Sequence, residues 1–168
     1  MQGKCTPHAG ISKRTAKQRG HVPSHQQSIV IRRPLDDVFA YMDDIDREHE
    51  WQPHLREAEQ LPSGPTAVGT RRRYVSDFLG KRLENTYVVQ LYQPGQRIVL
   101  ESTPDSVVNA KTDIRWEPVG EDTRVTMTLE GKASGPLRFV PNVLLEATFE
   151  KEVTGTLARL KETLEKGE

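Results

Sequence analysis

The sequence predicts one α+β domain in which a curved antiparallel sheet of about seven strands wraps around a long C-terminal helix. Three observations predict it. Strand-like segments follow one another with only short turns between them, their apolar residues alternate with polar ones, and residues 142–166 carry an apolar stripe at helical spacing. A chain of 168 residues favours one domain over two, and it is long enough to build a core without disulfides.

Residues 1–27 differ in composition from the remainder of the chain. They are rich in Gly, Ser, Lys, Gln and His, contain basic but no acidic residues, and have almost no apolar side chains to bury. We therefore expect a disordered basic leader over residues 1–27 and one ordered domain over residues 28–168. A solvated tail is the favoured interpretation of this leader, and a basic arm for nucleic acid is the less favoured alternative.

Order is expected to begin with a strand at residues 28–32, which are mostly β-branched or apolar. Pro34 then suits the first position of a helix whose apolar face comes from Leu35, Val38, Phe39 and Met42. A second short helix is expected over residues 47–52, and Pro53 limits it. Two short helices therefore follow the first strand.

Six further strands are expected in the middle of the chain, at 55–61, 70–77, 81–92, 97–103, 107–116 and 123–133. Turn signals such as Pro94-Gly95 separate them. Consecutive strands joined by short turns form an antiparallel meander and not βαβ units. Because apolar and polar residues alternate within the segments, one face of this sheet should be covered and the other should meet water.

The C-terminal segment supplies the cover. Its core-facing stripe consists of Leu145, Phe149, Val153, Leu157, Leu160 and Leu164, which recur every three or four residues. A helix of about 25 residues spans about 37 Å, which suffices to cross a whole sheet.

This order of elements comes with short motifs, namely Ile29-Val30-Ile31-x-x-Pro34-x-x-x-Val38-Phe39, Trp51-x-Pro53, Val68-Gly69-Thr70, Leu79-Gly80, Pro94-Gly95-x-Arg97 and Leu157-x-x-Leu160-Lys161-x-x-Leu164-Glu165. Over residues 28–166 the chain resembles the START/Bet v 1-like (SRPBCC) superfamily, most closely its polyketide cyclase/dehydrase and lipid-transport branch. The resemblance implies a helix-grip fold with a deep cavity between sheet and helix. It also implies a hydrophobic ligand such as a lipid, sterol, polyketide or quinone. Only a minority of such proteins are enzymes, and no shared catalytic signature carries a catalytic residue over to this chain.

The residues themselves also favour a cavity. A curved sheet and a single helix do not meet along their whole length, so the gap must be filled by side chains or by a ligand. The covered face includes the small or polar residues Asn85, Ser102, Ala110 and Thr112, which suit a lined pocket better than a tightly packed core. A ligand of ordinary size would need a volume of roughly several hundred Å³ that is reachable from solvent.

Nine residues are candidates for contact with such a ligand: Trp51, Arg72, Tyr74, Asn85, Tyr87, Trp116, Met127, Phe149 and Val153. Asn85 is expected to orient a ligand carbonyl or hydroxyl. Trp51 either gates the entrance or fastens the short helices to the sheet. If Tyr74 faces inward, Arg72 is a buried cation that needs a partner or an anionic ligand group. The opposite phase of this strand puts Arg71 and Arg73 inside, and the residues leave both phases open.

No metal or cofactor is expected. His49 and His54 are five residues apart with Pro53 between them, whereas a helical pair of zinc ligands needs a spacing of four. His54 as a general base near the entrance is the less favoured alternative to a solvated histidine. The chain also lacks a Gly-x-Ser-x-Gly elbow, a Walker loop and a Gly-x-Gly-x-x-Gly motif.

The sequence therefore favours a binding protein for a hydrophobic small molecule, and no catalytic residue is assigned. A polyketide aromatase/cyclase-type enzyme is the first alternative and a protein-interaction module the second, although no long exposed apolar strip is evident. Balanced totals of 24 basic and 24 acidic residues give no push toward nucleic acid. No apolar run is long enough for stable membrane insertion, and the single cysteine fits a cytoplasmic protein. A monomer or weak dimer is expected.

Overall fold

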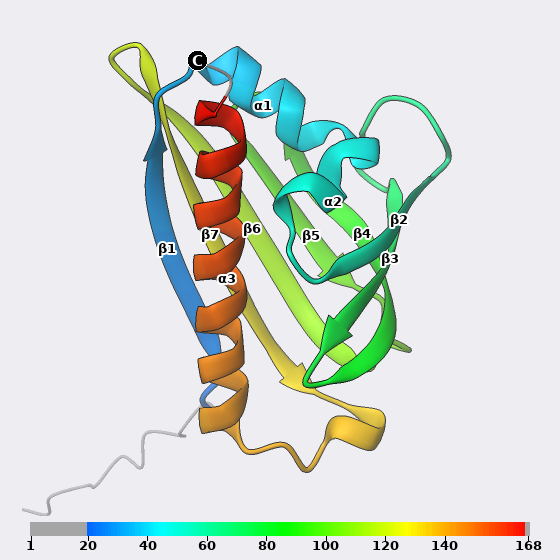
Figure 1. Ribbon diagram of the computed structural model, residues 1–168. Coiled ribbons are helices and arrows are strands. Elements are labelled where there is room, and N and C mark those ends of the chain that lie inside the picture. Colours follow the sequence, from blue (N-terminus) through cyan, green and yellow to red (C-terminus); the bar gives the residue numbers. More distant parts are fainter. Residues whose placement is uncertain (1–19, 167–168) are drawn as a thin grey trace, which may run out of the picture.

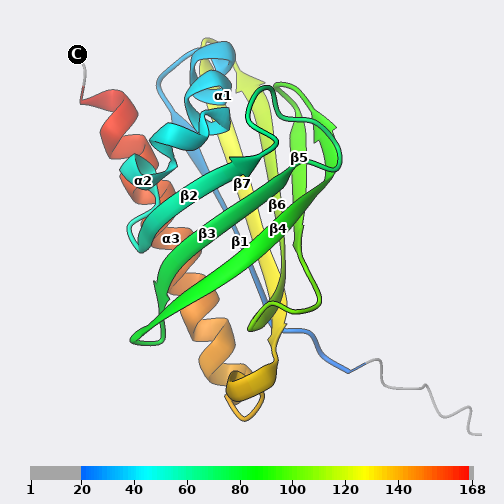
Figure 2. The ribbon, with the colours of Figure 1, turned by 90° about the vertical axis from the view of Figure 1, so that its right-hand side faces the viewer.

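The computed structural model describes residues 20–166, which form one seven-stranded sheet with the strand order β1-β7-β6-β5-β4-β3-β2. All neighbouring strands are antiparallel. The sheet curls around helix α3, as Figures 1 and 2 show. This arrangement is the helix-grip fold that the sequence predicts. The element bounds are β1 Ser24–Ile31, α1 Leu35–Asp43, η1 Ile45–Arg47, α2 Glu48–Trp51, β2 Leu55–Leu61, β3 Arg71–Phe78, β4 Lys81–Gln93, β5 Arg97–Ser102, β6 Val108–Val119, β7 Asp122–Ala133, η2 Gly135–Leu137 and α3 Asn142–Glu165.

The first strand is longer than the apolar pattern predicts. It begins at Ser24 and not near residue 28, and its polar start pairs with β7 in the register Ser24↔Glu130 to Gln27↔Met127. Backbone hydrogen bonds to β7 hold this edge, and they need no apolar side chains. The ordered domain therefore extends further toward the N-terminus than expected. The disorder expected for residues 1–19 falls outside the residues that the structure describes.

Helix α3 covers the half of the sheet formed by β1 and β7. Five residues of its predicted stripe, Leu145, Phe149, Val153, Leu157 and Leu160, are each at most 1% exposed, and Leu164 is partly buried. Val153, Leu157 and Leu160 share a core with sheet residues such as Ile31 and Val125, and Leu145 and Phe149 share a second core with Val108 and Ala110. Removal of this apolar surface from water is the main force that holds the helix in the sheet.

The short helices cover a different part of the concave face. Helix α1 lies over β6 and β7, where the ring of Phe39 meets that of Trp116 edge-on at 5.2 Å between centroids. Helix α2 packs between β2 and α3. The short helices and α3 thus close the concave face from two sides, and the remaining space lies between them.

The segment before α3 and the first turn of α3 expose apolar side chains. Phe139 and Val143 are 79% and 74% exposed, Leu144 is 47% exposed, and the Arg138 guanidinium lies over the Phe139 ring at 4.6 Å. The expectation concerned a long exposed apolar strip, and these three residues at one end of α3 do not contradict it. Separately, none of the helices within residues 20–166 combines the length and the apolar composition that a bilayer crossing requires.

Candidate functional site

A cavity of about 180 Å³ lies between α3, α2 and the concave face of the sheet. Its wall comes from the short helices, the turn after α2, strands β2 to β7 and α3. All nine candidates from the sequence lie on this wall, namely Trp51, Arg72, Tyr74, Asn85, Tyr87, Trp116, Met127, Phe149 and Val153. The structure therefore brings the whole predicted set together around one space. That these residues contact a ligand stays a prediction.

The cavity is smaller than the several hundred Å³ expected from the sequence. The reason is that large side chains occupy much of the gap. Trp51, Trp116 and Phe149 are at most 5% exposed and all border the cavity. For comparison, an apolar cavity of about 150 Å³ holds one benzene molecule. In this state the site has room for about one ring and not for a long acyl chain.

Arg72 lies inside, so the structure resolves the ambiguous phase of β3. Its side chain is 3% exposed and each guanidinium nitrogen donates to the protein. Nε donates to Gln60 Oε1 at 3.0 Å, Nη1 to Glu48 Oε1 at 2.8 Å, and Nη2 to Asp43 Oδ1 at 3.1 Å and Thr66 Oγ1 at 2.9 Å. The cation thus finds its partners in the protein, and it does not need an anionic ligand.

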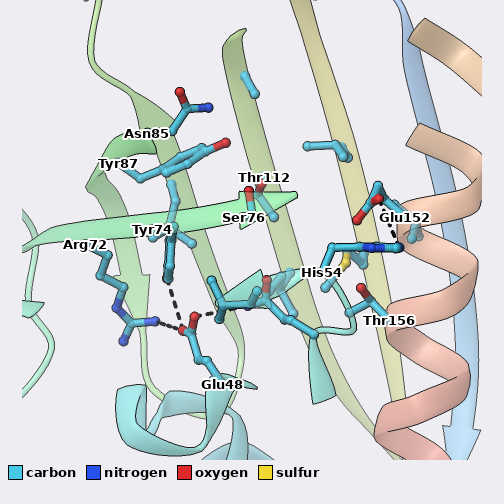
Figure 3. A pocket seen from close by; sticks show the side chains of 18 of the residues that line it. Glu48, His54, Arg72, Tyr74, Ser76, Asn85, Tyr87, Thr112, Glu152 and Thr156 are labelled. Carbon is cyan, nitrogen blue, oxygen red and sulfur yellow. Dashed lines mark hydrogen bonds and ion pairs between the residues drawn. The ribbon is translucent and has the colours of Figure 1, made fainter. Parts of the chain in front are cut away.

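Glu48 is the carboxylate at the centre of this network, and Figure 3 shows Arg72 and Tyr74 converging on it. It is 2% exposed, and its oxygens accept from Tyr74 Oη at 3.1 Å and from Gln52 Nε2 at 3.0 Å. Burial raises the pKa of Glu48 from 4.5 to about 7, although Arg72 and Tyr74 oppose this shift. A cavity-lining acid that titrates near neutral pH can donate or accept a proton.

The two tyrosines of the wall are held in their neutral forms. Burial, with the charge of Glu48, raises the pKa of Tyr74 well above its usual value, and burial also raises the pKa of Tyr87. Their rings lie 5.7 Å apart. Asn85 stands beside Tyr87 and its Oδ1 accepts from the backbone N–H of Val107 at 3.2 Å. Part of the Asn85 amide is thus committed to the loop before β6.

His54 and Glu152 form a polar pair on the cavity wall. His54, in the turn before β2, lies 3.4 Å from Glu152 of α3, and the two side chains are 38% and 25% exposed. Burial raises the pKa of Glu152, while His54 and Lys151 oppose the shift. His54 lines the cavity, whereas His49 is exposed and is not part of the wall. That His54 acts as a general base stays a prediction.

Trp51 lies inside the domain, and whether it gates the cavity or fastens the short helices to the sheet stays a prediction. It is the last residue of α2, borders the cavity and is 2% exposed. Its Nε1 has no hydrogen-bond partner among the described residues. The Nε1 of Trp116, the other tryptophan of the wall, donates to Met42 Sδ at 3.1 Å.

Sequence reasoning missed the acidic residues of the wall, Asp43, Glu48 and Glu152. The available signal was indirect, because an arginine on a covered face requires a carboxylate partner. Nothing in the linear sequence says that the partners stand 24 and 29 positions before it. Within residues 20–166, no three His, Cys, Asp or Glu side chains gather in a group that could hold a metal ion.

Comparison with known proteins identifies the family. The model of the family described as polyketide cyclase/dehydrase and lipid transport matches residues 23–165. The chain belongs to this family. The match covers nearly all of the residues that the structure describes, including the polar start of β1. No curated protein shows significant similarity to the chain.

Solved structures share the fold of this polyketide cyclase/dehydrase family member. A START superfamily protein from Mycobacterium smegmatis is 12% identical, with a TM-score of 0.73 over 86% of this chain and 99% of that one. The ZhuI aromatase/cyclase from a Streptomyces species is 19% identical, with a TM-score of 0.72 over 86% of this chain and 94% of that one. A protein from Thermus thermophilus is 20% identical, with a TM-score of 0.72 over 84% of this chain and 97% of that one. At these identities the likeness shows the fold alone.

Proposed function

We propose that this protein binds a compact, mainly apolar small molecule in the cavity between α3 and the sheet. The observation that carries the proposal is the cavity itself: about 180 Å³, bordered by aromatic and aliphatic side chains with a few polar groups. Such a mixture is typical of small-molecule sites, in which apolar walls give affinity and polar groups give orientation. The volume favours a ligand of about one ring over a lipid or a full-length polyketide.

Native mass spectrometry of the protein purified from cells tests this proposal, together with a thermal-shift screen of one-ring compounds. We expect a bound mass or at least one compound that raises the melting temperature. Thr112 lines the cavity, so Thr112→Phe should fill the space and abolish the shift. Thr112→Val keeps the volume and is the matched control. If a broad panel binds equally well to wild type and to Thr112→Phe, the cavity is not the binding site.

A cyclase- or dehydratase-type enzyme is the second candidate, and one specific observation favours it. Glu48 borders the cavity with a pKa near 7, and Tyr74 donates to it. Aldol condensation and dehydration both need a positioned acid or base. Dehydration of a one-ring β-hydroxyketone should then be lost in Glu48→Gln while binding of the ketone product persists. Equal dehydration rates for the wild type and this variant would contradict the enzymatic function and leave only the binding function.

A further inference from the structure

Thr156 is a buried residue of the cavity wall whose hydroxyl makes no hydrogen bond with the described part of the chain. Within residues 20–166, the polar or charged residues that are at most 8% exposed are Glu48, Gln60, Thr66, Thr70, Arg72, Ser106, Thr123 and Thr156. Each of the others uses its side chain in a hydrogen bond within the protein. Because buried polar groups in folded proteins are nearly always hydrogen-bonded, the hydroxyl of Thr156 calls for a partner from elsewhere.

This hydroxyl is within reach of a molecule in the cavity. The residues of α3 that line the cavity are Phe149, Glu152, Val153 and Thr156, whose spacing places them on one face of the helix. Figure 3 shows Thr156 on the cavity side of α3, one turn beyond Glu152. Among the described residues, the unpartnered side-chain nitrogens and oxygens that are closed off from a water-sized molecule are His25 Nε2 and Trp51 Nε1. The Oγ1 of Thr156 is not one of them, so it borders open space.

Two other threonines of α3 show how such a hydroxyl is usually satisfied. Thr148 Oγ1 donates to the carbonyl oxygen of Leu144, four residues earlier, at 2.8 Å. Thr154 Oγ1 donates to Gln27 Oε1 of β1 at 2.7 Å. Thr156 makes neither kind of bond within the described residues, so its hydroxyl can both donate to a ligand and accept from one.

Glu152 adds an acceptor beside this hydroxyl. Residues four apart are neighbours on a helix surface, so Glu152 and Thr156 present their oxygens to the same part of the cavity. The Oε1 of Glu152 lies 3.4 Å from His54 Nε2, and a carboxylate that meets one partner keeps capacity to accept further hydrogen bonds. A ligand hydroxyl placed here can accept from Thr156 and donate to Glu152. A ketone or ether oxygen can do only the first.

The charges around the cavity restrict the ligand further. Three carboxylates border it, Asp43, Glu48 and Glu152, against the guanidinium of Arg72 and the imidazole of His54. Arg72 is engaged through all three of its nitrogens, and His54 lies beside Glu152. Figure 3 shows Arg72 paired with Glu48, and His54 paired with Glu152. An anionic ligand would lose its hydration and find no uncommitted cation among the described residues of the wall.

We propose that the cavity selects a neutral one-ring molecule that carries a hydroxyl group, held by hydrogen bonds to Thr156 Oγ1 and to the Glu152 carboxylate, and that it rejects a carboxylate of similar size. This inference rests on the proposed binding function and names the class of ligand. The volume of about 180 Å³ sets the size, the hydroxyl of Thr156 sets the polar anchor, and the carboxylates of the wall set the charge.

The test uses three one-ring probes: toluene, phenol and benzoate. Toluene and phenol differ only in a methyl group against a hydroxyl. At about pH 8 phenol is neutral and benzoate is ionised. The probes are titrated into full-length protein with ¹³C-labelled threonine methyl groups, and NMR measures both the affinity and the shift of the Thr156 methyl signal. We expect phenol to bind at least as tightly as toluene, because hydrogen bonds in the cavity offset the hydration that its hydroxyl loses. Benzoate should bind at least about tenfold more weakly than phenol.

The variant Thr156→Val keeps the branched shape of the side chain and removes the hydroxyl. It also assigns the methyl signal of Thr156. In this variant the affinity for phenol should fall about three- to tenfold, whereas the affinity for toluene should change by less than about twofold. Thr154→Val is the matched control, because it removes a hydroxyl from an exposed position of α3 outside the cavity wall. It should leave the affinities for both probes unchanged.

The stability of the unliganded protein gives a second measurement. Since an unpartnered buried hydroxyl is replaced by a methyl group, Thr156→Val should have a melting temperature equal to that of the wild type or higher. A clear loss of stability would mean that the hydroxyl already has a partner within the protein, and it would overturn the inference. An unchanged affinity for phenol in Thr156→Val, or benzoate binding as tightly as phenol, also overturns the inference and leaves the binding function standing. Failure of all three probes to bind counts against the binding function itself.

Discussion

The two halves of the sheet are covered by different kinds of chemistry. On the β1–β7 side, α3 packs through fully buried aliphatic side chains such as Leu157 and Leu160. On the β2–β4 side, the short helices are held by hydrogen bonds and ion pairs that converge on Arg72. Apolar packing is non-directional and tends to close gaps. Hydrogen bonds fix distances and directions instead. The β2–β4 side can therefore be held at a distance from α3, with the cavity between them.

The largest expected loss of stability comes from breaking the hydrogen-bond network around Arg72 on the β2–β4 side. Arg72→Met leaves the buried Glu48 and the partly buried Asp43 without their cation, and removal of one partner of a buried pair typically costs about 3 to 5 kcal/mol. Urea unfolding followed by circular dichroism measures the loss. Arg73→Met is the matched control, because Arg73 is the next residue, carries the same charge and pairs with Glu84 at the surface. Equal losses for the two variants would show that the network does not hold the short helices.

On the β1–β7 side, where α3 packs through aliphatic side chains, the free energy of unfolding should fall when a buried side chain is shortened. Leu157 is 0% exposed, and Leu157→Ala should cost about 3 kcal/mol by removing buried methyl groups. Leu144→Ala, at a position of α3 that is 47% exposed, should change the free energy of unfolding by about 0.5 kcal/mol or less. The same urea experiment compares the two. A small loss for Leu157→Ala would mean that α3 is held mainly at its ends.

The smallest expected effect is the pH dependence of stability, which should come from Glu48 on the β2–β4 side. Burial raises the pKa of Glu48 from 4.5 to about 7, so the folded protein holds this proton more tightly than the unfolded chain does. The stabilisation that results from this proton on Glu48 is complete below the pKa of Glu48 in the unfolded chain. It is lost as pH rises through about 7, the pKa in the folded protein. Between about pH 5 and pH 8 the free energy of unfolding should fall by about 2 kcal/mol more in the wild type than in Glu48→Gln. Identical curves, or a Glu48 carboxyl ¹³C signal that titrates near pH 4.5, would contradict this assignment.

The architecture was predictable because its signals are local. The meander follows from alternating residues between short turns, and α3 follows from leucines at helical spacing. The early start of β1 was not predictable in this way. Residues Ser24–Gln27 are polar, and their order depends on the edge of β7, which lies about a hundred positions further along the chain.

The cavity wall was predictable in composition but not in chemistry. Candidates on the strands could be named from alternation and Phe149 and Val153 from helical spacing, and all nine candidates reached the wall. In β3 both phases present arginines, so the pattern alone could not choose Arg72. The partners of Arg72 come from short helices and loops, where no periodicity reports which side chain points inward. The final volume depends on how Trp51, Trp116 and Phe149 pack, which is a property of the assembled core.

Both tryptophans of the chain, Trp51 and Trp116, stand on the cavity wall. No other indole contributes to the intrinsic emission of the protein, so its tryptophan fluorescence originates entirely at the candidate site. Occupancy of the cavity should therefore be visible in the unmodified protein, without a dye or a label. The scaffold is in this sense its own optical reporter, and libraries of compounds or of wall variants can be sorted by the colour and intensity of that emission.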